Sequence, residues 1–145
     1  MTIRIEIAGM EELRRAFSNL YEVFDAAVAD AVEDTVYEID GEVKRRIARG
    51  PATGRVYEKY NPRRTHTASA PGQPPMTDTG RLVNSIEFDK IGDLTATVGS
   101  KLAYAAYLEY GTSRIAARPF FRPAIEEIRP KYMARLEKAL GDELR

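Results

Sequence analysis

The longest regular pattern in the chain is MEELRRAFSNLYEVFDAAVADAVEDTVYEIDGEVKRRI, residues 10–47. Its apolar residues recur at steps of three and four, which is the spacing along one face of an α-helix. Glutamates lie in the first turn and basic residues near the end, and both placements are favourable for the helix dipole. Gly50-Pro51 ends the pattern. The stretch therefore predicts an amphipathic helix of about 39 residues, roughly 58 Å long.

This helix is longer than a compact domain of the same chain length is wide. A domain of 145 residues is roughly 38 Å across when compact. Two arrangements are open: the helix bends, for which Gly41 is the easiest place, or it extends past its own domain and lies on another subunit.

Alternation of apolar and charged residues predicts strands outside the helix. TIRIEI, residues Thr2–Ile7, alternates with a period of two. Ser85–Lys90 and Leu94–Gly99 flank the turn Ile91-Gly92-Asp93, so they predict an antiparallel hairpin.

Shorter helices are predicted in the second half of the chain. One carries Leu82 and Val83, and Thr77 or Asp78 can cap it. Residues 101–110 are predicted to form either a short helix or an irregular turn that ends at Gly111.

A last helix is predicted at Ala124–Leu144, with Pro123 suited to its first turn. Pro130 should kink this helix or mark its true start. The elements together predict a single α+β domain, residues 1–145, in which the two long helices pack on a small antiparallel sheet.

Residues 49–77 are rich in glycine, proline, serine, threonine and arginine. ASAPGQPP, residues 68–75, is incompatible with a helix or a central strand. We expect this segment to be an arm that protrudes or is disordered. Its basic and aromatic residues are candidates for contact with a neighbouring subunit or with DNA: Arg55, Tyr57, Lys59, Tyr60, Arg63 and Arg64.

The composition excludes several kinds of site. The chain has no cysteine, so disulfides, thiolate zinc sites and a cysteine nucleophile are excluded. His66 is the only histidine, and no nucleophile-elbow or phosphate-loop motif is present. No apolar run reaches the roughly 20 residues that span a bilayer. We therefore predict no catalytic residue, no metal, no cofactor and no membrane partner.

The net charge is zero, but the charges are unevenly distributed. Residues 6–42 hold eleven acidic and two basic residues, whereas residues 44–64 hold eight basic and one acidic. This asymmetry indicates pairing with a neighbour, a basic arm facing a polyanion, or two solvated faces.

YLEYGTSRIAARPFFRPAIEE, residues 107–127, concentrates aromatic, arginine and proline residues. Tyrosine and arginine cover apolar area while keeping polar contacts, so they dominate many protein interfaces. The stretch is either a packed corner of the core alone or a core corner that also forms a subunit interface. The interface candidates are Tyr104, Tyr107, Glu109, Tyr110, Gly111, Thr112, Arg118, Pro119, Phe120 and Arg122.

Three motifs carry a resemblance to a known family: ASAPGQPPMTDTGRLVNSI at 68–86, YAAYLEYGT at 104–112 and ARPFFRPAIEE at 117–127. In this order and spacing they resemble the phage minor tail component family whose type member is gene product ten of an HK-type siphophage. The resemblance covers nearly the whole chain. The basic run at 55–64 is longer than such an arm needs, and no catalytic residues come with the family.

The resemblance implies a tail-completion or head–tail joining protein of a long-tailed phage, a prophage or a gene transfer agent. Such proteins work as rings, generally hexameric, at the head-proximal end of the tail. The implied partners are further copies of the chain, the tail tube or terminator, the head-completion proteins and DNA in transit through the channel. The implied location is the tail or neck of the virion, after assembly in the cytoplasm of the host bacterium.

Two other functions stay open from the residues alone. A DNA-binding accessory protein would use the basic and aromatic residues at 55–64 for phosphate contact and stacking, although no recognised binding motif is present. A hydrolase is the weaker alternative, because its only histidine lies in the polar arm.

Overall fold

The structure, a computed structural model, describes residues 10–92 and 94–143. The strand predicted at Thr2–Ile7 lies outside the described residues. The elements follow in the order α1 (Met10–Ala48), β1 (Val56–Tyr60), β2 (Arg63–Thr67), α2 (Arg81–Asn84), β3 (Ile86–Gly92), β4 (Thr95–Ser100), α3 (Ala103–Tyr110) and α4 (Phe121–Glu143). The predicted α+β class is confirmed.

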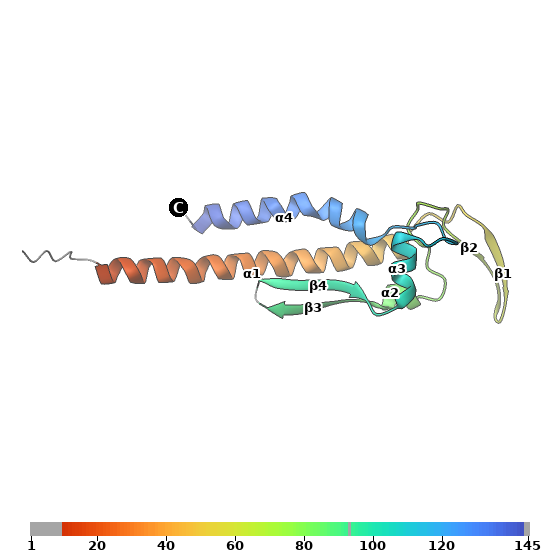
Figure 1. The fold of residues 1–145 in the computed structure, drawn as a ribbon, viewed down its shortest axis with the longest axis horizontal. Coiled ribbons are helices and arrows are strands. Elements are labelled where there is room, and N and C mark those ends of the chain that lie inside the picture. The colour runs from red at the N-terminus through yellow and green to blue at the C-terminus, as the bar shows by residue number, and fades with distance from the viewer. Residues whose placement is uncertain (1–9, 93, 144–145) are drawn as a thin grey trace, which may run out of the picture.

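The helix α1 is unbroken over 39 residues. A Cβ atom at Gly41 would meet nothing within 4 Å, so this glycine serves no close approach. The helix α4 lies alongside α1 and runs antiparallel to it (Figure 1). Arg46 bonds to Glu127 at 2.6 Å, and Arg135 bonds to Glu38 further along both helices. The structure therefore does not show a break at Gly41, which was the first of the two arrangements that the length of α1 left open.

The hairpin β3–β4 packs on the opposite side of α1 from α4 (Figure 1). Its strands are antiparallel, with Ile86 opposite Ser100. The rings of Tyr37 and Phe88 meet edge to face with centroids 4.9 Å apart, which ties the hairpin to α1. A two-stranded sheet is marginal alone in water, so α1 supplies the surface that stabilises it.

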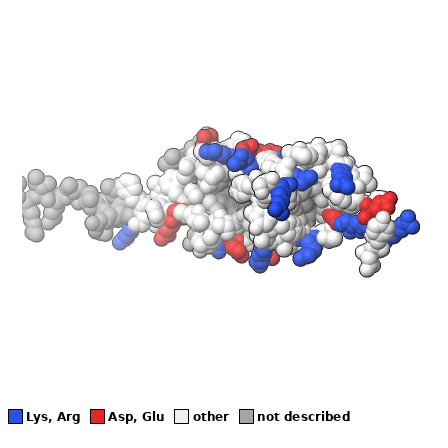
Figure 2. All heavy atoms as spheres, turned by 45° about the vertical axis from the view of Figure 1, so that its right-hand side comes forward, with Lys and Arg blue, Asp and Glu red and all other residues white. Residues whose placement is uncertain are grey.

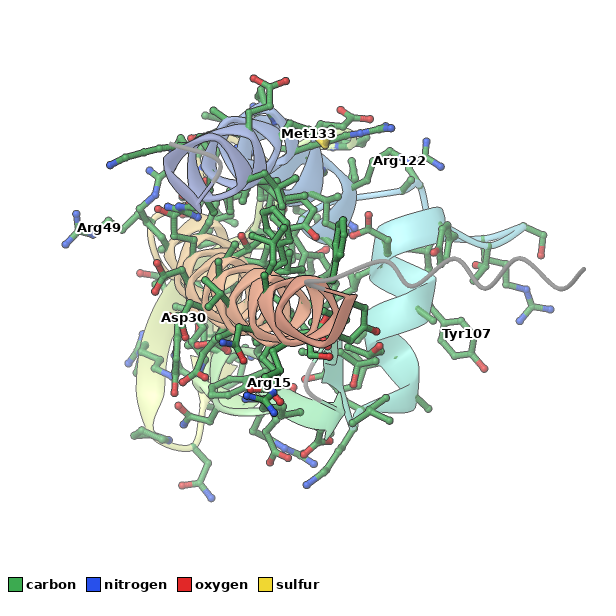
Figure 3. All side chains as sticks on the ribbon, turned by 90° about the vertical axis from the view of Figure 1, so that its left-hand side faces the viewer. Arg15, Asp30, Arg49, Tyr107, Arg122 and Met133 are labelled. Atoms are coloured by element: carbon green, nitrogen blue, oxygen red, sulfur yellow. The ribbon has the colours of Figure 1, made fainter. Side chains whose placement is uncertain are left out.

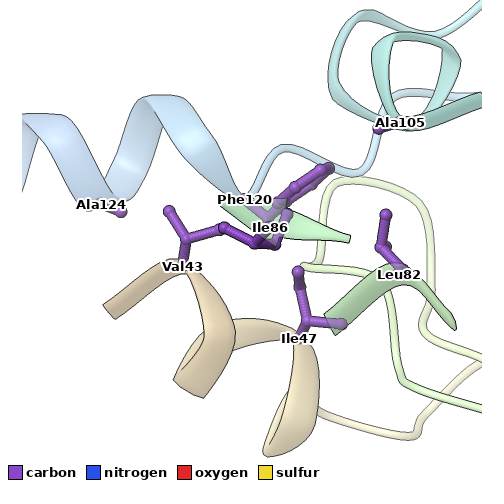
Figure 4. Packing of buried hydrophobic residues seen from close by; sticks show 7 residues of the cluster. All are labelled: Val43, Ile47, Leu82, Ile86, Ala105, Phe120 and Ala124. Atoms are coloured by element: carbon purple, nitrogen blue, oxygen red, sulfur yellow. The ribbon is translucent and has the colours of Figure 1, made fainter. Parts of the chain in front are cut away.

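The core lies at the C-terminal end of α1, where α1, α2, β3, α3 and α4 each contribute a buried side chain (Figure 4). Phe120, Val43 and Ile47 are fully buried, and Ile86 is nearly so. Burial of one such side chain contributes about 1.5–3 kcal/mol. The cluster consists of Val43, Ile47, Leu82, Ile86, Ala105, Phe120 and Ala124.

Two helix starts differ from their predictions. Gly80, at φ 77°, precedes α2 as its cap residue and no side chain caps the helix, so neither Thr77 nor Asp78 has the predicted role. The helix α4 begins at Phe121 and runs through Pro130. The prediction that Pro130 marks the true start is therefore wrong, because a side chain from α3 stabilises the earlier start, as described below.

The segment predicted as an arm contains a hairpin that the sequence did not predict. Strands β1 and β2 pair antiparallel, from Val56 opposite Thr67 to Tyr60 opposite Arg63. The backbone of Ala68 extends the pairing through bonds to Gly54 and Arg55 at 2.8 and 3.0 Å. This hairpin forms one end of the molecule (Figure 1).

The arm returns to the core after β2. Ser69 is 2 % exposed and Pro75 is buried. The Thr77 N–H donates to the Ile47 carbonyl oxygen at 3.1 Å. The proline-rich part of the arm therefore packs against the end of α1.

Candidate interaction surface

Glu109, on α3, holds the beginning of α4. Its carboxylate accepts hydrogen bonds from the backbone N–H groups of Phe120 and Phe121 through Oε2, and of Arg122 through Oε1, at 2.8–2.9 Å. The first N–H groups of a helix have no partner within the helix, and a negative charge is favourable beside them. Glu109 is 8 % exposed, so its role in the structure is to join two helices of one subunit.

The turn between α3 and α4 is closed by its own backbone. Gly111, at φ 75°, follows α3, and a Cβ atom there would lie 2.9 Å from the Ala117 nitrogen and the Ile115 oxygen. The Thr112 N–H donates to the Ile115 carbonyl at 2.8 Å, and the Arg118 N–H donates to the Leu108 carbonyl at 2.6 Å. The YGT motif therefore shapes a compact turn for which glycine is required.

This turn is bonded to the arm. The Gly72 N–H donates to the Ala117 carbonyl oxygen at 2.8 Å, and the Arg118 guanidinium donates to the Ser69 carbonyl oxygen at 3.3–3.4 Å. A hollow of about 330 Å³ lies between them, lined in part by Tyr57, Tyr104 and Arg118. The two groups of predicted site residues thus meet at the same end of the molecule.

Asp78 is the carboxylate that the basic hairpin contacts. It forms a hydrogen-bonded ion pair with Lys59 and a second ion pair with Arg64 at 2.6 Å, while His66 Nδ1 lies 3.8 Å from its Oδ1. The hydrogen bond from Lys59 and the charge of Arg64 hold the pKa of the Asp78 carboxyl below its usual range, against a partial desolvation that acts in the opposite direction. Asp78 therefore fixes the hairpin to the segment before α2.

The predicted interface residues divide by exposure. Phe120 is fully buried and Glu109 nearly so, so neither presents a side chain on the surface of the subunit. Gly111, Arg118 and Pro119 are half-buried. Tyr107 points outward from α3 (Figure 3). The exposed members are Tyr104, Tyr107, Tyr110, Thr112 and Arg122.

The predicted arm residues divide in the same way. Lys59 and Arg64 are half-buried and bonded to Asp78. The Arg55 guanidinium lies 5.3 Å above the centre of the Tyr57 ring, a cation–π contact. The exposed members are Arg55, Tyr57, Tyr60 and Arg63.

Charge separates along the molecule. Residues 15–42 of α1 hold eight acidic residues and one basic residue. Residues 49–81 hold six basic and two acidic residues, and residues 110–125 hold three basic residues and no acidic one. On the face that Figure 2 shows, Lys and Arg predominate toward the end that carries β1 and β2.

Sequence reasoning missed a second exposed surface, on the N-terminal half of α1. Phe17 is 63 % exposed and Tyr21 is 68 % exposed. The helical period placed Phe17 on the apolar side of α1, but periodicity does not show where the packing partners of a long helix end. The length of the helix was the one available signal.

Neither a metal site nor a membrane-spanning helix is present among the described residues. Within residues 10–92 and 94–143, no cluster of histidine, aspartate and glutamate side chains has the arrangement of a metal site. In the same part of the chain, no helix combines the length and the apolar character needed to cross a membrane.

The described fold has exposed tyrosines and arginines at one end and an acidic helix at the other, which are features of an assembly subunit. Residues 11–111 match the family described as "Bacteriophage HK97-gp10, putative tail-component". The chain therefore belongs to this family of structural tail components, as its motifs predicted. No curated protein and no solved structure gives a significant match.

Proposed function

We propose that this protein completes the tail of a long-tailed phage, a prophage or a gene transfer agent, and joins it to the head. In this role, copies of the chain form a ring at the head-proximal end of the tail and become part of the virion neck. The proposal includes no catalytic activity and no cofactor.

The exposed tyrosine and arginine side chains at the end carrying α3 and β1–β2 support this role most directly. Tyr110 and Tyr60 are each 76 % exposed, and Tyr107 is 54 % exposed. Residues of this kind are enriched among those that dominate binding energies at protein interfaces. Because Glu109 and Phe120 are buried, the proposed interface uses Tyr104, Tyr107, Tyr110, Thr112 and Arg122, with Gly111, Arg118 and Pro119 shaping the turn.

The charge separation supports contacts between unlike surfaces. A ring needs a heterologous interface, in which one patch of a subunit meets a different patch of the next. A basic end and an acidic helix are suited to such contacts. We propose a hexamer that also binds the tail tube or terminator and the head-completion proteins after assembly in the host cytoplasm.

In vitro joining tests the function. Heads and tails from a phage lacking this gene are mixed with purified protein, and joined particles are counted by electron microscopy and by infectivity. Wild-type protein should restore joining, and a Tyr107→Ala, Tyr110→Ala variant should not, while its thermal unfolding stays unchanged. Joining without the protein, or equal joining by the variant, would contradict the proposal.

DNA binding through β1 and β2 is the second candidate. The exposed Arg55, Tyr57, Tyr60 and Arg63 are suited to phosphate contact and base stacking. Binding to random duplex DNA that weakens steeply with salt, together with normal joining by an Arg55→Ala, Arg63→Ala variant, would favour a DNA-facing hairpin.

A further inference from the structure

The N-terminal part of α1 projects beyond the rest of the subunit (Figure 1). The pairs Arg46–Glu127 and Glu38–Arg135 are eight residues apart on both helices, so α1 and α4 keep one antiparallel register. Toward its C-terminal end, α4 continues along α1 past the tip of the β3–β4 hairpin (Figure 1). On the other side of α1, Lys90 near the tip of β3–β4 lies 3.5 Å from Glu33.

The hairpin therefore ends near residue 33 of α1, and α4 ends further toward the start of α1. The helix starts at Met10 and projects past the ends of both layers (Figure 1). Residues 15–19 and 21–23 of this part are exposed, whereas Phe24, Asp25 and residues 27–29 are half-buried. A short helix without packing partners is marginal in water, which favours a partner for this part of α1.

The projecting part carries an apolar stripe. Phe17, Leu20 and Phe24 continue, at helical spacing, the face of α1 that holds Ala31, and Tyr21 lies beside them. Ala31 is 5 % exposed, whereas Phe17 is 63 % exposed. The stripe has the spacing of the anchors with which a helix binds an apolar groove.

The charge of this segment disfavours pairing with itself. Residues 15–30 contain Glu22, Asp25 and Asp30, and Arg15 is their only basic residue. Two such helices side by side would bring like charges together, which is unfavourable. A surface that is apolar with a basic rim fits the segment better.

The subunit has such a surface between β4, α3 and α4. A groove of about 530 Å³ is lined in part by Val98, Leu102, Tyr110 and Phe121, and it ends at Ile125. Ile125 is 46 % exposed. On its other side a second hollow of about 470 Å³ continues over α1, where Val36 and Ile39 lie between β4 and α4 in its lining.

Basic side chains surround this groove. A third hollow of about 310 Å³ adjoins the groove, and Ile125 lines all three. Lys101 lines the groove, Arg122 the third hollow and Arg129 the second, and all three side chains are exposed. Of the two acidic residues in the same lining, Glu109 is engaged by the three N–H groups of α4 and only Glu126 is exposed.

We propose that residues 15–25 of α1 lie in this groove on a second copy of the chain. Phe17 and Tyr21 enter the hollows on either side of Ile125, and Glu22 and Asp25 face the basic rim. The contact is heterologous, so each copy offers one helix and one groove, and repetition closes a ring or extends a filament. The inference deepens the proposed function by assigning the two surfaces of the subunit contact.

The absence of cysteine makes disulfide trapping a clean test. Single variants Tyr21→Cys and Ile125→Cys are purified, mixed and oxidised. The mixture should shift from the 16.3 kDa chain to a covalent dimer of twice that mass, because each variant supplies one of the two surfaces. Neither variant should form the dimer alone.

Matched controls use exposed positions outside the contact. Val23→Cys replaces Tyr21→Cys, since Val23 lies on another side of α1 and is 41 % exposed. Ala134→Cys replaces Ile125→Cys, since Ala134 is exposed and lies half a turn around α4 from Ile125. Either replacement should remove the covalent dimer.

The same test is repeated on assembled tails with the double variant Tyr21→Cys, Ile125→Cys, which should give covalent multimers. A dimer of Tyr21→Cys alone would show that the helix pairs with itself and would overturn the proposal. So would the lack of covalent product in both the mixture and the tails. Covalent multimers from a protein that is dispensable for joining would refute the proposed function and leave this contact standing.

Discussion

Replacing Glu109 should weaken the fold of the subunit more than any change at its exposed tyrosines. In Glu109→Ala, three backbone N–H groups lose the carboxylate that they contact at 2.8–2.9 Å. The N–H of Phe120 suffers most, because Phe120 is fully buried and water has little access to it.

The size of the loss follows from these contacts. A buried donor left without a partner costs about 1–3 kcal/mol, and loss of a helix N-cap costs about 1 kcal/mol. We expect Glu109→Ala to lower the free energy of unfolding by about 3 kcal/mol. At about 4 °C for each kcal/mol in a chain of this size, Tm falls by roughly 12 °C.

Glu109→Gln gives a graded intermediate. One amide oxygen can replace Oε2, which accepts from Phe120 and Phe121, but the NH₂ group then faces the Arg122 N–H. About half of the loss of the alanine variant is expected, since two bonds survive without the charge.

Urea and thermal unfolding of purified protein, followed by far-UV circular dichroism, measure both variants. Glu126→Ala is the matched control, because Glu126 is exposed on α4, the helix that Glu109 caps, and its loss should change the free energy of unfolding by less than about 0.5 kcal/mol. If Glu109→Ala unfolds like Glu126→Ala, the carboxylate does not stabilise the start of α4 and this reasoning fails.

Three further predictions concern the arm and the turn. Because the pKa of Asp78 is lowered in the folded protein, its ionised form stabilises the fold above its ordinary pKa of 3.8, and this contribution disappears as the pH falls through the lower folded pKa. Asp78→Asn should remove that part of the acid dependence in urea unfolding between about pH 7 and about pH 2; an unchanged dependence would count against the ion pairs. Gly111→Ala should cost about 1–2 kcal/mol more than Gly72→Ala, since both glycines have positive φ but only Gly111 has backbone atoms at 2.9 Å from the added Cβ; equal losses in thermal unfolding would show that the turn can relax. Arg63→Glu should reduce head–tail joining and leave Tm unchanged, because Arg63 is exposed; a parallel loss of Tm would mean that it serves the fold instead.

The elements that were predicted correctly are those whose residues form a regular pattern within a single segment of the chain. The period of α1 persists over 39 residues, so its ends were placed well. The strands β3 and β4 were predicted within two residues, because a glycine turn separates two alternating runs.

The hairpin β1–β2 gave no such signal. Every residue of β1 is exposed except Lys59, which is half-buried. The strand therefore has no buried face, and its sequence VYEKY shows no alternation of apolar and polar residues. The strands are held by backbone pairing and by the ion pairs of Asp78. Neither is visible in a hydrophobic pattern.

The role of Glu109 depends on spatial proximity alone. Its partners are 11–13 residues further along the chain, and only the turn after Gly111 brings them within reach. The sequence placed this glutamate among exposed aromatics, and an interface role was the natural prediction. In the folded subunit Glu109 is buried, whereas its neighbours Tyr107 and Tyr110 are exposed.

The bond between Glu109 and α4 has a consequence for dividing the chain into units. The match to the family covers residues 11–111, and its boundary falls between the carboxylate and the three donors that it requires. Phe120 and Ala124, which complete the core, also lie beyond that boundary. A fragment ending at Gly111 would leave the Glu109 carboxylate without these donors and would expose the apolar side of α1 that α4 covers. We therefore expect that the recognisable region does not fold on its own and that any shortened form of the protein must include α4.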